Sequence, residues 1–103
     1  MNEPLQPTRC ARALRALADP ERLRIVSRLR DGPRNVSELA ALLGAELVNI
    51  SHHLGVLRNA GVVRDERRGR FVVYRLHPDV FRAADADHLD LGCCRLEIPR
   101  GDG

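Results

Sequence analysis

The stretch that decides the fold is AELVNISHHLGVLRNAG at residues 45–61, followed directly by VVRDERRGRFVVYRL at residues 62–76. In its first part the apolar residues recur every three or four positions, at Leu47, Ile50, Leu54 and Leu57. This spacing predicts a helix over residues 45–60 that turns these four side chains toward the core. Gly61 is the expected stop signal of that helix.

In the second part the pattern changes to that of β-strands. Two β-prone runs, residues 62–67 and 70–76, are joined at Arg68-Gly69. This arrangement predicts a β-hairpin that follows the helix after a single glycine.

Three more helices are predicted upstream from their start and stop signals. The first spans residues 8–17. Asp19 as N-cap and Pro20 as first helical residue begin the second, which Gly32-Pro33 stops. Asn35 begins the third as a capping box with Glu38, and Gly44 ends it. This third helix, a tight turn and the helix over 45–60 together have the form of a helix-turn-helix.

After the hairpin, Pro78 is expected to open a last helix that contains Val80, Phe81 and Ala84. The predicted order is α-α-α-α-β-β-α, a mainly α protein with a β-hairpin wing (α+β), that is, a winged helix-turn-helix. We assign residues 1–84 to this domain and residues 85–103 to an acidic C-terminal tail that contains cysteines. A chain of 103 residues forms only a small core, which favours a dimer.

The charges are distributed unevenly along the chain. All 17 basic residues are arginine, and the net charge is +3. Residues 1–75 carry 14 arginines against 8 acidic residues, whereas residues 76–103 carry 3 against 6. A basic body of this kind favours a polyanionic partner such as nucleic acid.

Polar residues of the 45–60 helix point to DNA as that partner. With the apolar stripe turned to the core, Asn49, Ser51, His52 and Arg58 are left for other contacts. In the major groove Asn pairs with adenine, Arg with guanine, and Ser with either base edge. An ordinary solvated helix face is the alternative reading of these four residues.

The predicted tip of the hairpin is strongly basic. Arg67, Arg68 and Arg70 crowd around Gly69, where their like charges repel one another. Phosphates would neutralise them, and an arginine side chain also fits a narrow minor groove. We expect these three residues to contact DNA, with a merely solvated charged surface as the alternative.

Other classes of protein find little support in the sequence. No stretch approaches the about 20 apolar residues of a membrane span, and the first residues lack the apolar run of a signal peptide. We therefore expect a cytoplasmic protein without membrane contact. There is no Gly-rich phosphate loop, nucleophile elbow or pair of catalytic carboxylates, so no enzyme is expected. A protein-interaction module would explain the tail but not the arginine-rich hairpin.

Four consecutive motifs carry a resemblance to a known family. They are LADPERLRI at 17–25, VSELA at 36–40, ISHHLGVLRNAGVV at 50–63 and RGRFVVY at 68–74. Over residues 12–82 the chain resembles the ArsR/SmtB metalloregulatory repressors. The resemblance implies a homodimer built on the first and last helices, which binds a double-stranded operator with an inverted repeat. It also implies that an inducer relieves this binding. We expect that no cofactor is required for DNA binding.

The usual inducer sites of such relatives are incomplete here. Many relatives bind arsenite or a soft metal through a Cys-Val-Cys word on the third helix, where this chain has VSELAAL at 36–42. Others use carboxylates and histidines on the last helix. Asp85, Asp87 and His88 are present, but a second histidine with a carboxylate partner is missing.

Three cysteines remain as candidate ligands, namely Cys10, Cys93 and Cys94. In a cytosolic protein they are expected to be reduced thiols. Three thiolates form a trigonal set that suits a soft ion, so arsenite or a similar metalloid is the predicted inducer. The resemblance implies that the first helix lies near the last helix of the partner, which would bring Cys10 to the tail pair.

Other interpretations of the cysteines stay open. Cys10 shares a helix face with Leu14 and Leu17, so it could be a small buried residue. The pair Cys93-Cys94 could be incidental. Alternatively, the protein is a repressor of the same fold that responds to oxidants or persulfide, with Cys10 bonded to one tail cysteine.

Overall fold

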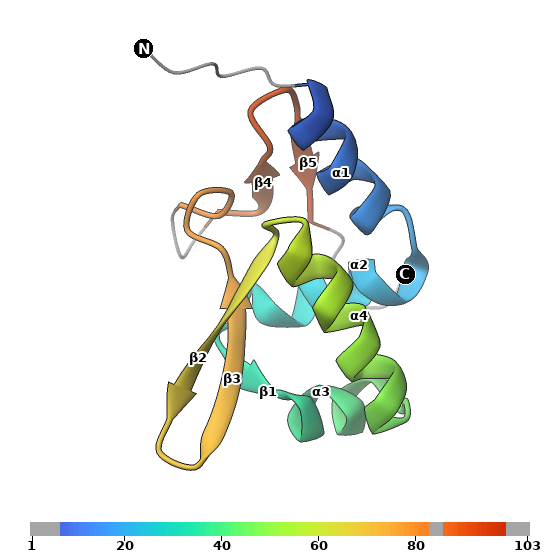
Figure 1. Cartoon of the computed structure of the whole chain (residues 1–103), viewed down its shortest axis with the longest axis vertical. Helices are drawn as coiled ribbons and strands as arrows, with labels where there is room; N and C mark the ends of the chain where they lie inside the picture. The colour runs from blue at the N-terminus through green and yellow to red at the C-terminus, as the bar shows by residue number, and fades with distance from the viewer. Residues whose placement is uncertain (1–6, 83–85, 99–103) are drawn as a thin grey trace.

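The computed structural model describes residues 7–82 and 86–98 (Figure 1). Four helices come first, α1 (Pro7–Leu17), α2 (Pro20–Leu29), α3 (Val36–Leu43) and α4 (Leu47–Asn59). They are followed by the strands β2 (Val63–Arg68) and β3 (Phe71–Leu76). The predicted winged helix-turn-helix is therefore confirmed, with α3 and α4 as the helix pair and β2–β3 as the wing.

The predicted helix caps are present. The Asp19 carboxylate accepts the N–H groups of Glu21 and Arg22 at 2.9 and 3.1 Å. Partial burial raises the pKa of Asp19, but these N–H groups and the charge of Arg22 outweigh it, so the pKa lies below its usual value. Asn35 and Glu38 form both hydrogen bonds of the capping box, each at 2.8 Å.

The wing differs from the prediction by one residue at its tip. Arg68 pairs with Phe71, so the two-residue loop is Gly69-Arg70 and not Arg68-Gly69. Gly69 has φ +62°, and a glycine at the first loop position is typical of a type II′ hairpin turn. A short strand that was not predicted, β1 (Arg34–Asn35), pairs with the other edge of β3 and gives the sheet order β1-β3-β2.

The predicted last helix is wrong. The N–H groups of Val80 and Phe81 both bond to the carbonyl of His77, which makes a single turn. The carbonyl of Val80 then accepts the N–H of Asp90 at 2.8 Å, so the segment is held by a second hairpin instead of continuing as a helix. That hairpin consists of β4 (His88–Asp90) and β5 (Arg95–Glu97). Ala84, also assigned to the helix, lies outside the described residues.

The core joins all of these parts. Ile50, Leu54 and Leu57 of α4 are fully buried as predicted, but Leu47 is 54% exposed, so its assignment to the core is wrong. Leu89 of β4 is also fully buried and belongs to the same cluster as the helices. The β4–β5 hairpin is therefore packed on the winged helix.

Helix length bears on membrane insertion. Among the described residues, no single helix is long and apolar enough to cross a bilayer, and only α3 and α4 taken together, bent by 113°, have the length and composition for it.

Candidate nucleic-acid interface and cysteine cluster

The first half of α4 presents a continuous exposed surface. Asn49, Ser51 and His52 are exposed, as the apolar spacing predicted. Two apolar residues not predicted to belong to this surface, Leu47 and Val48, precede them and are 54% and 70% exposed. The apolar spacing assigned Leu47 to the buried face, and Val48 lies outside that spacing, so its exposure is the signal that the pattern did offer.

His53, the next residue of α4, contacts another helix of the same chain. It is half-buried, and Nη1 of Arg22 lies 3.1 Å from its Nδ1. Because an arginine only donates hydrogen bonds, the histidine nitrogen is the acceptor. Nε of the same arginine donates to the carbonyl of Ala16. Arg22 therefore links α4 to the end of α1.

Arg58 lies apart from the other predicted base contacts. It is in the last turn of α4, and its Nη1 forms an ion pair at 3.5 Å with Asp65 on β2. Both side chains are well exposed to solvent, so this pair contributes little to stability. Arg58 remains accessible, but its charge is partly compensated.

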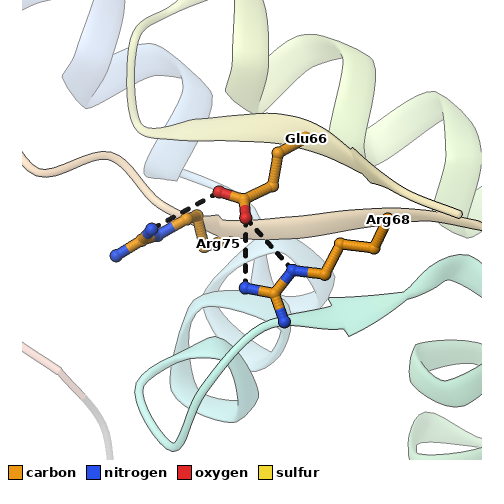
Figure 2. Close-up of polar contacts among 3 residues, drawn as sticks. All are labelled: Glu66, Arg68 and Arg75. Atoms are coloured by element: carbon orange, nitrogen blue, oxygen red, sulfur yellow. Dashed lines mark hydrogen bonds and ion pairs between the residues drawn. The ribbon is translucent and has the colours of Figure 1, made fainter.

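The arginines of the wing fall into two groups. Arg68 donates to the Glu66 carboxylate through Nε at 3.2 Å and Nη2 at 3.1 Å, and Nη1 of Arg75 lies 3.4 Å from the other Glu66 oxygen (Figure 2). The hydrogen bond from Arg68 lowers the pKa of Glu66 most, and that from Arg75 lowers it further. Glu66 and Arg68 are two residues apart on β2 and therefore share one face, a sequence signal that could have identified the pair.

Arg67 and Arg70 are the second group. Both are exposed, and neither has a hydrogen bond or ion pair with any of the residues 7–82 and 86–98. Their positive charges are therefore free to meet an anionic partner.

The wing tip and the first turn of α4 lie at the same end of the molecule (Figure 1). The N-terminus of a helix carries a partial positive charge, because its first N–H groups have no partner within the helix. Free arginines and a helix N-terminus together make this end of the domain attractive to phosphates.

The three cysteines meet at the opposite end, where the β4–β5 loop lies beside the beginning of α1 (Figure 1). All three Sγ atoms lie within 4.8 Å of one another, and those of Cys93 and Cys94 are 3.8 Å apart. Cys10 and Cys93 form a disulfide with Cα atoms 6.2 Å apart, and Cys94 is free and exposed. The expectation that all three are thiols is therefore wrong for this state. The cluster also forms within one chain, without the partner's helix.

Backbone contacts of the second hairpin hold the cysteine loop in place. Leu91 donates its N–H to the Cys94 carbonyl at 2.9 Å, and the N–H of Gly92 bonds to the Asp90 carboxylate at 3.0 Å. Leu89 in the core then anchors the strand that leads into the loop. Because of this anchoring, residues 83 positions apart in the chain come together.

The cluster fits a soft ion by its donor set. Three sulfur atoms around one ion at a bond length near 2.3 Å would be about 4 Å apart in a trigonal arrangement. Among the described residues it is also the only group of three cysteines, histidines or carboxylates close enough to share an ion. His88 contacts Asp87 and Arg95 instead, at 3.7 and 3.2 Å, and Asp85 lies outside the described residues.

Comparison with known proteins identifies relatives. Residues 19–65 match the profile described as bacterial regulatory protein, arsR family. The chain is 44% identical over 88 residues to the HTH-type transcriptional regulator NmtR of Mycobacterium tuberculosis, which covers 80% of this chain and 73% of that protein. It is 42% identical to the arsenic resistance transcriptional regulator ArsR1 of Pseudomonas putida, over 70% of this chain and 57% of that one. The HTH-type transcriptional repressor SmtB of Mycobacterium tuberculosis is 51% identical over 61% of this chain, which spans about half of SmtB (47%).

Solved structures agree with these matches. The homodimeric winged helix-turn-helix DNA-binding domain of Mb0332 from Mycobacterium bovis, a possible ArsR-family regulator, superposes with a TM-score of 0.65 at 35% identity, over 67% of this chain and 64% of that one. Reduced HlyU from Vibrio cholerae has a TM-score of 0.64 at 31% identity, over 68% and 74%. This chain therefore belongs to the ArsR family of bacterial DNA-binding transcriptional regulators and is not an enzyme.

Proposed function

We propose that this chain is a homodimeric repressor that binds an inverted-repeat operator and releases it when an inducer occupies the cysteine cluster. The observation that carries the proposal is the convergence of Cys10, Cys93 and Cys94, whose sulfur atoms lie within 4.8 Å of one another. The inducer we propose is arsenite or another thiophilic ion.

The proposed DNA contacts are those of α4 and the wing. Exposure of the side chains and the free charges at the wing tip support them. The base contacts are assigned to Asn49, Ser51, His52 and Arg58, and the phosphate contacts to Arg67, Arg68 and Arg70.

A dimer supplies the symmetry of the operator. The homodimeric relative from Mycobacterium bovis supports this assembly, as does Leu14 of α1, an apolar side chain that is 43% exposed in the single chain. Two recognition helices related by a two-fold axis would enter successive major grooves about 34 Å apart. Sedimentation should therefore show a dimer at micromolar protein concentration, and a monomer there contradicts the proposal.

The cysteine cluster holds an ion only after the disulfide is reduced, because thiolates are the metal ligands. Arsenite, as As(OH)₃, would condense with the three thiols and release three water molecules. An inducer works only by preferring one state of the repressor, and typical couplings of about 1–3 kcal/mol lower operator affinity about 5- to 150-fold. We propose that the bound ion, by linking α1 to the β4–β5 loop, favours a state of the dimer in which the distance between the α4 helices of the two protomers is changed.

A redox-responsive repressor is the second candidate, and the Cys10–Cys93 disulfide supports it. In that case peroxide would take two electrons from the two thiols, form the S–S bond and leave two water molecules. Cys94 is dispensable for this reaction but is a ligand in the first proposal.

This difference gives the decisive experiment. Operator binding is followed by fluorescence anisotropy with reduced protein, titrated with arsenite or with peroxide, for the wild type, Cys94→Ser and Cys10→Ser. Arsenite induction predicts release from the wild type, a much weaker response of Cys94→Ser, and none of Cys10→Ser. If Cys94→Ser responds to arsenite like the wild type, the three-sulfur site is wrong. If only peroxide releases the DNA, and does so equally from Cys94→Ser, the redox candidate replaces it.

A further inference from the structure

Two apolar side chains at the start of α4 are exposed without a contribution to the core. Val48 is 70% exposed and Leu47 is 54% exposed. Valine in the first turn of a helix stabilises it poorly, because its branched side chain loses rotamer freedom and it does not cap the free N–H groups. The stability of the domain therefore gives no reason for valine at this position.

The position of Val48 relates it to the proposed DNA contacts. Ser51 and His52 follow it by three and four residues, so the three side chains share one face of α4. All three are exposed. A base edge that meets Ser51 and His52 would therefore have Val48 beside it.

The major groove offers one apolar group to such a side chain. The C5-methyl of thymine is the only methyl that the four unmodified bases display there, and apolar residues contact it in other protein–DNA complexes. The charges near α4 favour DNA as the occupant over a second copy of this chain. Arg67 and Arg70, which have no partner among the described residues, belong to the wing tip, and the wing tip lies at the same end of the molecule as the start of α4 (Figure 1).

We infer that Val48, with Leu47 beside it, reads thymine methyl groups and so selects thymine at one position of each operator half-site. The inference rests on the proposed binding of DNA by α4. Recognition would then combine hydrogen bonds from the polar residues of α4 with one apolar contact. The preference for thymine at that position would depend on its single C5-methyl group.

The test removes that methyl group from the DNA. A preferred duplex is first selected from random sequences with the wild-type protein, and each thymine is then replaced by deoxyuridine, which differs only in lacking the C5-methyl. Loss of one buried methyl-sized group, about 0.8 kcal/mol, is about a fourfold loss of affinity per half-site and about 15-fold for both half-sites. The Val48→Ala variant should lose affinity for the thymine duplex and show no further loss with deoxyuridine.

A control variant tests whether the response to deoxyuridine is specific to Val48. Leu42→Ala removes another exposed apolar side chain, 41% exposed on α3, and should leave the response to deoxyuridine unchanged. If the wild type binds a selected sequence but never distinguishes thymine from deoxyuridine, the inference is wrong and the binding proposal stands. If Val48→Ala turns a dimer into a monomer, the patch is an interface between copies. If the wild type selects no DNA, the proposed function itself fails.

Discussion

Replacing Arg70 by glutamine tests the wing with a single lost charge. Arg70 is in the Gly69-Arg70 loop, is exposed, and has no ion pair with any residue that the structure describes. Its charge is therefore available to a phosphate. Glutamine keeps a polar side chain at this position, so the fold of the hairpin should be unchanged.

The expected effect follows from counterion release. Each phosphate neutralised by a protein cation contributes about 0.9 to the slope of log affinity against log salt concentration. A dimer carries two wings, so Arg70→Gln should lower the slope by about 1.8. Over a fourfold rise in salt, the wild type should lose about 12-fold more affinity than the variant.

The assay is fluorescence anisotropy with labelled duplexes at several salt concentrations, on a selected sequence and on random DNA. Both duplexes should show the same change of slope, because phosphate contacts carry no sequence information. Arg68→Gln should have a smaller effect, since Glu66 already compensates part of the Arg68 charge at 3.1 Å (Figure 2). Glu66→Gln should instead strengthen binding, because it removes a negative charge next to the proposed phosphate contacts.

An unchanged slope for Arg70→Gln, with the variant still dimeric and folded by circular dichroism, would refute the assignment of the wing tip to DNA. Equal effects of Arg68→Gln and Arg70→Gln would refute the distinction between a compensated and a free arginine.

The other predictions concern stability. Leu89→Ala should lower the free energy of unfolding by about 2–5 kcal/mol in urea titrations, because this fully buried side chain joins the second hairpin to the core; a change under about 0.5 kcal/mol would contradict that packing. Asp19→Ala should cost about 1 kcal/mol by loss of the α2 cap. The pKa of Asp19 is lowered in the folded state, so its charge stabilises the protein above about pH 4 and this contribution is lost as the pH falls through the folded pKa. The stability difference between the wild type and Asp19→Asn, which keeps the cap without the charge, should therefore disappear in acid, and persistence at pH 2 would rule out the charge as its cause. Gly44→Ala should cost roughly 1–2 kcal/mol in the same titration, because Gly44 ends α3 with φ +62°; an unchanged midpoint would argue against that conformation.

The local elements could be predicted because their signals lie within a few residues of one another. The Asp19-Pro20 start, the capping box of Asn35 and Glu38, and the two β-prone runs of the wing each define an element from neighbouring residues. The exposure of Asn49, Ser51 and His52 followed from the same local periodicity. The resemblance of motifs in this region was likewise enough to identify the family.

The tertiary structure alone decided which segments meet. Pro78 was a valid helix start by local criteria, but the chain makes only a single turn there, because the Val80 carbonyl accepts the N–H of Asp90 in a second hairpin whose Leu89 is fully buried in the core. That hairpin carries Cys93 and Cys94 to Cys10 across 83 residues, a contact that no local pattern encodes. The exposure of Leu47 and the pairing of Glu66 on β2 with Arg75 on β3 were decided in the same way. Local sequence specifies backbone conformation through short-range hydrogen bonds and sterics, whereas burial and charge compensation depend on neighbours that only the folded chain brings together.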